Sequence, residues 1–251
     1  MAEKETSLAV STPPGEYKIA TMDQKALPIM LRDNCGVGGI DQFEMDRVSM
    51  PAGGGQQWSV PTLEGEENPA TIEGVCVLFQ DGRAYWEKSF EETGGGAPPD
   101  CQSTDGGITG AGDRAGCGEK TTQACAACPL AEFGSGKGNA QACKSQRLLY
   151  LLRPDNILPL IIALSPGSLK GVKKFFVRLT AAGIAYYGCV IRVGLEKTQN
   201  AEGVKYSRAT FAMIGRMTPE ETEKFKGFNE VFKEIFAGAA VVTQSDENDA
   251  F

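Results

Sequence analysis

The chain has 251 residues, of which 41% are hydrophobic and 23% charged, and it contains 31 glycines, 8 cysteines and no histidine. This composition is typical of a soluble protein of one or two domains with irregular insertions. The lack of histidine excludes Ser-His-Asp and Cys-His nucleophiles, His-ligated catalytic zinc and an imidazole general base. Because no Walker, dinucleotide-binding or EF-hand motif occurs either, we expect a protein that is not an enzyme.

The charge is distributed unevenly along the chain, although the net charge is only −7. Residues 1–136 carry −12, residues 137–216 carry +10 and residues 217–251 carry −5. Lysine and arginine gathered in one part of a fold favour a groove for a polyanion, because bound phosphates release condensed counterions. The alternative is a solvated surface whose local excess of cations has no function.

The sequence also predicts a cytoplasmic location. The longest apolar stretch, 157–164, is far shorter than the roughly 20 residues that a membrane-spanning helix needs. The N-terminal residues mix both charge signs and lack the apolar segment of a secretory signal. In a reducing compartment, cysteines are more often metal ligands or free thiols than disulfides.

The N-terminal part of the chain carries weak structural signals. Residues 1–16 have few large apolar side chains and predict a flexible leader. Two short β-like runs follow at 43–50 and 56–60, around a run of three glycines. The role of residues 17–70 stays open, since they could complete a barrel or form a small arm.

Stronger β signals begin at Thr71. Residues 71–79 and 83–90 predict two strands joined by a tight turn at Asp81-Gly82. From 93 to 146 the β pattern stops, and the segment is rich in glycine, cysteine, aspartate and threonine with almost no aliphatic side chains. Something other than hydrophobic burial must therefore hold this insert together.

After the insert, residues 147–152 and 157–165 predict strands, and the second is apolar on both faces, as in a buried strand. A helix is then expected from an N-cap at Ser168 to about Ala182, with Gly183 as the C′ residue. Its apolar side chains recur at spacings of three and four, and its opposite face carries the cations Lys170, Lys174 and Arg178.

Two long strands are predicted next, at 184–196 and 204–215. A last helix begins at Thr218, with Pro219 at its first position and Glu221 completing a T-x-x-E capping box. Beyond it, the chain ends in an acidic stretch.

This order of elements predicts a mainly β fold with some α-helix. A helix between the third and fourth of five strands is the order of an OB-fold, a five-stranded Greek-key barrel. We expect an OB-fold-like domain over residues 17–240, containing the Cys-rich insert 93–146 and a C-terminal helix, followed by a disordered acidic tail at 241–251. A different α+β sheet is the alternative.

The insert carries five of the cysteines, and the unit Cys125-Ala126-Ala127-Cys128 allows one turn to aim two thiolates at one tetrahedral ion. Without histidine the site would be a closed tetrathiolate site, which is structural rather than catalytic. We predict a structural Zn²⁺ with the ligands Cys101, Cys125, Cys128 and Cys143, and Cys117 as the alternative ligand. An iron–sulfur cluster or a flexible loop with free thiols are the other possibilities.

On the OB hypothesis, aromatic side chains stack on bases and cations follow the DNA backbone. For any single aromatic, a place in the core is the favoured interpretation, whereas the set, interleaved with cations, suits a single-strand groove better. The candidate DNA-binding aromatic residues are Trp58, Tyr85, Trp86, Tyr186, Tyr187, Tyr206 and Phe211. The candidate cations are Arg83, Lys88, Lys137, Lys144, Arg147, Arg153, Lys170, Lys174, Arg178, Arg192, Lys205, Arg208 and Arg216.

The C-terminal stretch combines acidic side chains with a terminal aromatic residue: Asp246, Glu247, Asp249 and Phe251. After a basic domain, such a tail can occupy the basic groove when DNA is absent, and its phenylalanine can dock into a partner. Composition alone indicates only a solvated tail.

Together these features resemble the phage-type replicative single-stranded-DNA-binding proteins. The similarity lies in the OB-like core, the insert from Cys101 through CAACPLAEFGSGKG to Cys143 and RLLYLL, and the tail SDENDAF, and it spans about 73–251. A zinc insert in a related phage protein uses a histidine ligand, which this chain lacks, so the metal site is carried over only as a type.

The resemblance implies a sequence-independent protein that coats single-stranded DNA in replication, recombination or repair, in the host cytoplasm if phage-encoded. It also implies that the tail recruits a polymerase, helicase or primase, and it leaves open a homo-oligomer. The alternative function is a zinc- or iron–sulfur-containing adaptor that binds acidic protein partners.

Overall fold

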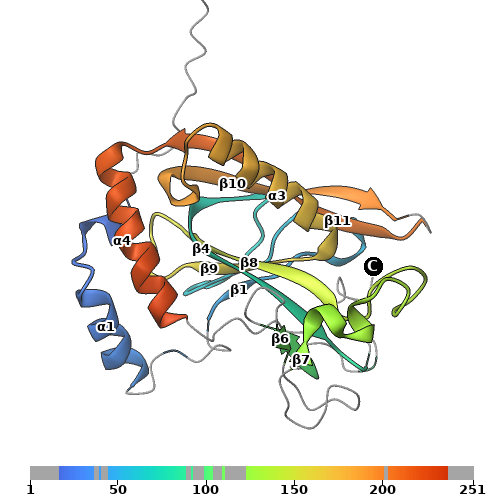
Figure 1. The fold of residues 1–251 in the computed structure, drawn as a ribbon. Helices are drawn as coiled ribbons and strands as arrows, with labels where there is room; N and C mark the ends of the chain where they lie inside the picture. Colours follow the sequence, from blue (N-terminus) through green and yellow to red (C-terminus); the bar gives the residue numbers. More distant parts are fainter. Residues whose placement is uncertain are drawn as a thin grey trace, which may run out of the picture.

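The computed structural model describes residues 17–36, 40, 45–88, 92, 99–103, 109–110, 123–200 and 203–236. These residues form a mixed α/β architecture in which a curled half-barrel sheet is accompanied by three α-helices (Figure 1). The helices are α1 (Ala26–Cys35), α3 (Pro166–Ala181) and α4 (Pro219–Ile235). In this part of the chain, no helix has the length and apolarity to cross a membrane. The expected leader and acidic tail lie outside the described residues.

The main sheet has seven strands in the order β1-β9-β8-β4-β10-β11, with β5 beside β4. All pairings are antiparallel except that of β1 with β9. Its strands are β1 (Arg47–Val48), β4 (Thr71–Tyr85), β5 (Cys101–Ser103), β8 (Lys144–Leu152), β9 (Leu160–Leu164), β10 (Cys189–Gln199) and β11 (Lys205–Arg216). Two smaller sheets pair β2 (Val60–Thr62) with β3 (Gly65–Glu67), and β6 (Thr109–Gly110) with β7 (Gln123–Ala124).

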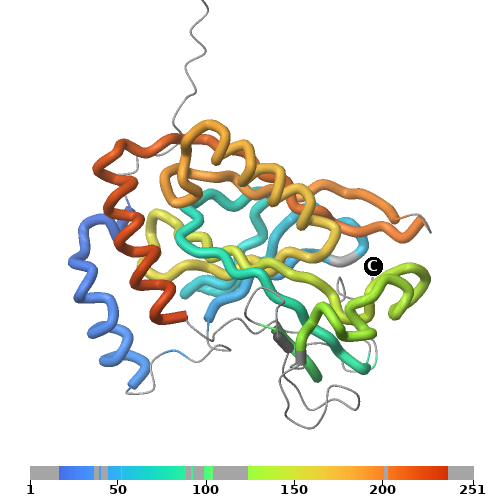
Figure 2. The backbone as a smooth tube through the Cα atoms, in the orientation of Figure 1, coloured from blue at the N-terminus to red at the C-terminus, as the bar shows by residue number. Residues whose placement is uncertain are grey.

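The expected turn at Asp81-Gly82 is wrong, because β4 is one continuous strand whose bend is visible in Figure 2. On one edge, Asp81 is paired with Arg147 of β8 and the ladder continues through Gly82. On the other edge, a Cβ atom at Gly82 would lie 2.6 Å from the carbonyl oxygen of Ser103. The glycine therefore allows β5 to approach closely, which is a second common reason for glycine within a strand.

Several further boundaries differ from the expected ones, and two of them bear on the packing. Strand β10 begins at Cys189 rather than at residue 184, because Tyr186–Gly188 form a 3₁₀ turn, η6. Helix α3 has Ser165 as its N-cap residue. Ser168 is instead fully buried, and its Oγ accepts a hydrogen bond from the backbone N–H of Ala209, 3.0 Å away. That bond ties α3 to β11.

Both faces of the sheet are covered, since successive side chains of a strand point to opposite faces. Leu149 and Leu151 of β8 belong to the core that lies under α3. Leu148, Tyr150 and Leu152 belong to the core on the other face, under α1 and α4. In Figure 1, α4 and α1 lie together at one side of the sheet. The face of β4 and β8 under α4 is thus closed to any ligand.

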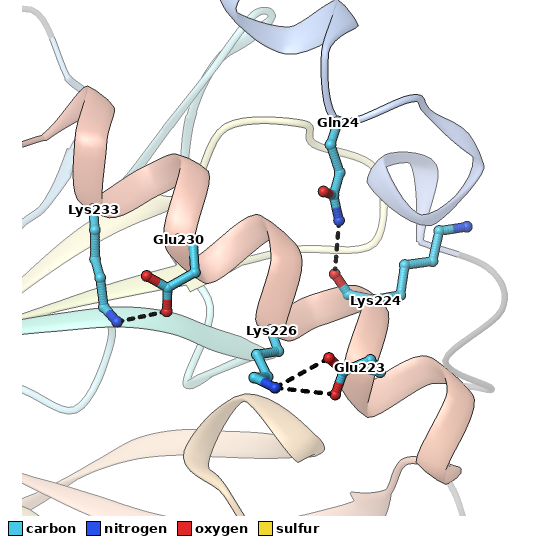
Figure 3. A network of polar contacts seen from close by, with 6 residues as sticks. All are labelled: Gln24, Glu223, Lys224, Lys226, Glu230 and Lys233. Carbon is cyan, nitrogen blue, oxygen red and sulfur yellow. Dashed lines mark hydrogen bonds and ion pairs between the residues drawn. The ribbon is translucent and has the colours of Figure 1, made fainter.

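Helix α4 begins with the expected capping box: the side chain of Thr218 accepts from the backbone N–H of Glu221, and Glu221 accepts from that of Thr218. Its outer face carries the ion pairs Lys226–Glu223 and Lys233–Glu230, at 3.0 and 2.8 Å (Figure 3). The Gln24 amide donates to the carbonyl oxygen of Lys224 at 3.4 Å. Such exposed pairs contribute little to stability, because water and salt screen them.

Candidate nucleic-acid interface and cysteine segment

Helix α3 presents an unusual cationic face. Val172, Phe175 and Leu179 are buried in the core. The opposite face exposes four cations, Lys170, Lys173, Lys174 and Arg178. The helix contains no acidic residue, and none of the four cations makes an ion pair with any residue that the structure describes.

The same face is hollowed. A shallow depression of about 720 Å³ is lined by the four cations together with Pro166, Leu169 and Val177. Val177 is 67% exposed, although a valine is normally buried. Like charges one turn apart on a helix repel each other, so an anionic ligand would stabilise this surface. The arrangement of cations around aliphatic groups suits a polyanion that also has apolar parts.

Three other candidate arginines, Arg153, Arg192 and Arg208, differ from these cations because each has a carboxylate partner. Arg153 pairs with Glu67 at 3.2 Å. Arg192 pairs with Glu73 and Arg208 with Glu196, both at 2.7 Å. A phosphate would have to displace or share these partners. These three arginines are therefore weaker phosphate sites than the cations on α3.

Arg147 and Arg83 serve the fold. The Arg147 side chain is buried, and its Nε and Nη2 donate to the two carboxylate oxygens of Asp81 at 2.6 and 2.7 Å. Its guanidinium carbon lies 4.5 Å from the centre of the Phe79 ring. Arg83 donates to the carbonyl oxygen of Cys143 at 3.0 Å and so anchors the insert to β4. Arg147 is closed to DNA in this fold.

Among the seven candidate aromatic residues, Trp58 is buried and the other six are half-buried. Trp58 is fully buried, and its indole N–H donates to the carbonyl oxygen of Val193 at 3.3 Å. Phe211 stacks on Phe175, with ring centres 5.9 Å apart. Trp58 therefore does not reach a surface on which a base could stack.

Tyr186 and Tyr187 lie in the 3₁₀ turn η6 and not in a strand, although the predicted strand 184–196 includes them. The Tyr186 ring stacks on Phe176 at 5.9 Å, and its hydroxyl accepts from Asn229 at 2.8 Å. Burial raises the pKa of Tyr186 to about 12. Tyr187 packs against the core under α4. Both belong to the packing between the sheet and the helices.

The remaining candidates are half-buried or exposed. Tyr85, Trp86, Tyr206 and Lys144 are half-buried. Lys88, Lys137, Lys205 and Arg216 are exposed. Cys117 and the tail residues Asp246, Glu247, Asp249 and Phe251 lie outside the described residues.

The four cysteines expected as zinc ligands are all buried: Cys101, Cys125, Cys128 and Cys143. The backbone N–H of Cys128 donates to the carbonyl oxygen of Cys125 at 3.2 Å, closing the turn between them. Cys101 pairs with Tyr85 on one edge of β4, and Lys144, next to Cys143, pairs with Ala84 on the other edge. The two outer cysteines therefore flank the end of β4 on its two edges.

The thiols interact electrostatically. Burial raises the pKa of Cys143, the hydrogen bond from Arg83 opposes that rise, and the nearby Cys125 and Cys128 add to it. Among the residues that the structure places, no three His, Cys, Asp or Glu side chains are arranged to hold a metal ion. The cysteines thus share one buried region, but their side chains are not set around a single centre.

Two accessible residues were missed by the sequence patterns. Lys173 belongs to the α3 face, and its place beside Lys174 in an amphipathic helix was a usable signal. Phe133 is 76% exposed and lies in the glycine-rich segment, where no periodicity indicates its direction.

Comparisons with known proteins found no relative of this chain. Neither the protein families, nor the curated proteins, nor the solved structures contain a significant match to this chain. The function must therefore be argued from the site itself.

Proposed function

We propose that this protein binds single-stranded DNA without sequence preference and that the cationic face of α3 carries the main phosphate contacts. The observation behind the proposal is that Lys170, Lys173, Lys174 and Arg178 share one accessible face with no carboxylate partner in the described part of the chain. They lie in the segment that carries +10, between two acidic segments. Unpaired cations contact phosphates without first losing an ion pair.

The helical face also offers apolar contact. Leu169 and Val177 line the same depression as the cations. A single strand exposes bases and sugars beside its phosphates, whereas a duplex presents mainly phosphates at its surface. Cations that follow the backbone, with aliphatic groups between them, therefore favour an unpaired strand. Binding of this kind reads no sequence.

An OB-fold-like barrel is the fold that we propose for the domain. The order β4, β8, β9, α3, β10, β11 along the chain, with the spatial order β9-β8-β4-β10-β11, supports it. Strand β4 takes the place of the two strands expected before the insert, and two strands, β8 and β9, follow the insert. Together with β10 and β11 they make up the five strands of the proposed barrel. Helix α4 covers one face of the sheet, so that face has no room for DNA. We therefore propose that the DNA site lies on α3.

We propose that the insert holds a structural Zn²⁺ through Cys101, Cys125, Cys128 and Cys143. Their burial and the closeness of Cys143 to Cys125 and Cys128 support this, and the thiols would have to turn toward one centre. Bound zinc would stabilise a segment that has almost no aliphatic core. Zinc would do no chemistry on DNA.

The role of the tail is proposed on its composition. Asp246, Glu247 and Asp249 would compete with DNA for the cationic face, and Phe251 would dock into a replication protein. In this view, the protein protects single strands during replication, recombination or repair.

The proposal is tested by titrating a fluorescently labelled oligo(dT) and following anisotropy at several salt concentrations. A labelled strand is preferable to tryptophan emission, because Trp58 is buried. We expect log affinity to fall with log salt by about 0.7 for each phosphate contacted, and duplex DNA of equal length to bind more weakly. The double variant Lys170→Gln/Lys174→Gln should weaken binding and lower the slope by about 1.4.

The control is Lys226→Gln/Lys233→Gln on α4, which changes the net charge equally but removes cations that are already paired. This control should leave both affinity and slope nearly unchanged. Binding that is insensitive to salt, or an equal loss in both double variants, would overturn the proposal. Tighter binding to an acidic protein than to oligo(dT) would favour the adaptor function.

A further inference from the structure

One aromatic side chain stands out by its exposure. Among the aromatic residues that the structure describes, Phe133 alone is mainly open to solvent, with 76% of its surface exposed. It follows the 3₁₀ turn Pro129–Ala131 and precedes the sequence Gly134-Ser135-Gly136-Lys137-Gly138. A phenylalanine ring in water costs free energy that burial against a partner would recover.

The loop that carries this ring is tightly closed. The backbone N–H groups of Gly134 and Gly136 both donate to the carbonyl oxygen of Ala140, at 3.0 and 2.9 Å. The Ser135 Oγ bonds the carbonyl oxygen of Glu132 at 2.7 Å and accepts from the N–H of Ala142 at 2.9 Å. These bonds fix the backbone on both sides of Phe133.

The glycines of the loop are needed for this geometry. Gly134 and Gly138 have φ values of 89° and 61°, a region that side-chain-bearing residues rarely adopt. At Gly136, a Cβ atom would lie 3.1 Å from the backbone nitrogen of Ala142. The loop is thus a rigid support for the ring, and little ordering entropy is lost when a ligand stacks on it.

A cation accompanies the ring. Lys137 lies at the tip of the same closed loop and is exposed. An aromatic face beside a lysine is the combination that binds one base and one phosphate of a single strand. In Figure 1, this segment and the β10–β11 hairpin lie at the same end of the molecule, away from α1 and α4. The other candidate aromatics are buried or half-buried, so Phe133 has the most accessible ring face for a base.

We propose that Phe133 stacks on an unpaired nucleobase and that Lys137 contacts an adjacent phosphate. The inference rests on the proposed binding of single-stranded DNA, and it makes the insert a part of the DNA site. Stacking needs only a π-face, so it adds affinity without adding sequence preference.

The test compares the full chain with its Phe133→Ala, Phe133→Leu and Phe133→Trp variants in oligo(dT) titrations. We expect Phe133→Ala to weaken binding roughly 5-fold to 150-fold, the range that loss of one stacked base produces. Phe133→Leu should lose nearly as much, because leucine keeps apolar area but has no ring, and Phe133→Trp should keep the affinity. The salt slope should not change, because the ring releases no counterion.

A second strand that is abasic at every position makes the test specific for stacking. On this strand, wild type and Phe133→Ala should differ much less than on oligo(dT). Equal losses on both strands, or wild-type affinity of Phe133→Ala for oligo(dT), would overturn the inference while leaving the proposed function intact. Absence of binding by the wild type would overturn both. An unchanged melting temperature of Phe133→Ala would show that the loss is not one of folding.

Discussion

At the scale of single residues, the environment decides what a cation does. Arg147 and Lys170 were both candidates for DNA contact. Arg147 lies between the sheet and α3, where Asp81 binds it through two hydrogen bonds and the rings of Phe79 and Phe176 lie 4.5 and 5.5 Å from its guanidinium carbon. Lys170 lies on the open face of α3. Residue type and chain position could not separate them.

The pair of Arg147 with Asp81 should stabilise the fold measurably. Replacing Asp81 by alanine leaves a buried guanidinium without its counter-charge, which typically costs about 3 kcal/mol or more. The Asp81 side chain is 38% exposed, so we expect about 2–3 kcal/mol. Urea unfolding at pH 7 measures the change.

The matched control is Glu196→Ala, which removes the carboxylate from the exposed pair with Arg208. It should cost less than about 1 kcal/mol. Equal losses in the two variants would contradict the structural role assigned to Arg147.

At the scale of elements, the insert shows how a segment without an apolar core is held. Its backbone bonds itself in short turns, Arg83 ties it to β4, and its cysteines are buried. The turn at Cys125–Ala127 and the adjacent Cys128 were expected from the CxxC spacing. The convergence of the more distant cysteines depends on the pairing of β5 and β8 with opposite edges of β4.

We expect the purified protein to contain about one zinc ion per chain and Cys125→Ser to lose it. Since burial raises the pKa of Cys143, zinc binding should release protons and weaken as pH falls. Elemental analysis and limited proteolysis of the insert before and after chelation measure the effect. Cys35→Ser, at an exposed cysteine on α1, is the control and should keep the metal. Iron with visible absorbance would indicate an iron–sulfur cluster instead of zinc. A protein without metal would contradict the metal site.

Some local sequence patterns predict a structure that the strand pairing overrides. Asp81-Gly82 is a strong turn signal by itself, yet β8 and β5 pair with both edges of that stretch. The competing explanation for the glycine, close approach of another strand, depends on residues about 20 positions further along the chain. In contrast, the capping box at Thr218 and the positive φ of 67° at Gly183 are local features, and both predictions are confirmed.

At the scale of the whole molecule, buried acids link stability to pH. Burial raises the pKa of Cys189 to about 11 from an ordinary value of 9.0. Burial also raises the pKa of Tyr150 and of Tyr186 to about 12 from 10.0. In each case the folded protein holds the proton more tightly than the unfolded chain, so the stabilisation is complete below the unfolded pKa and is lost as pH rises to the folded pKa.

We therefore expect the free energy of unfolding to fall between about pH 9 and pH 12, with the Cys189 contribution lost between about pH 9 and pH 11. Urea unfolding at pH 8, 10 and 11 measures this. In Cys189→Ala, the decline between pH 9 and pH 11 should be shallower than in the wild type. An identical decline would show that the thiol does not contribute.

The amino-acid sequence alone determined the properties that depend on neighbours within a few residues: the amphipathic and basic character of α3, the capping of α4, the CxxC turn and the separation of charge into three segments. Tertiary structure decided which candidate side chains reach solvent. Burial of Trp58 and Arg147 follows from strands and helices that are distant in sequence, and no periodicity within one segment contains that information. For the same reason, only the packing of α4 over the sheet and of α3 across it indicated which face stays accessible to a ligand.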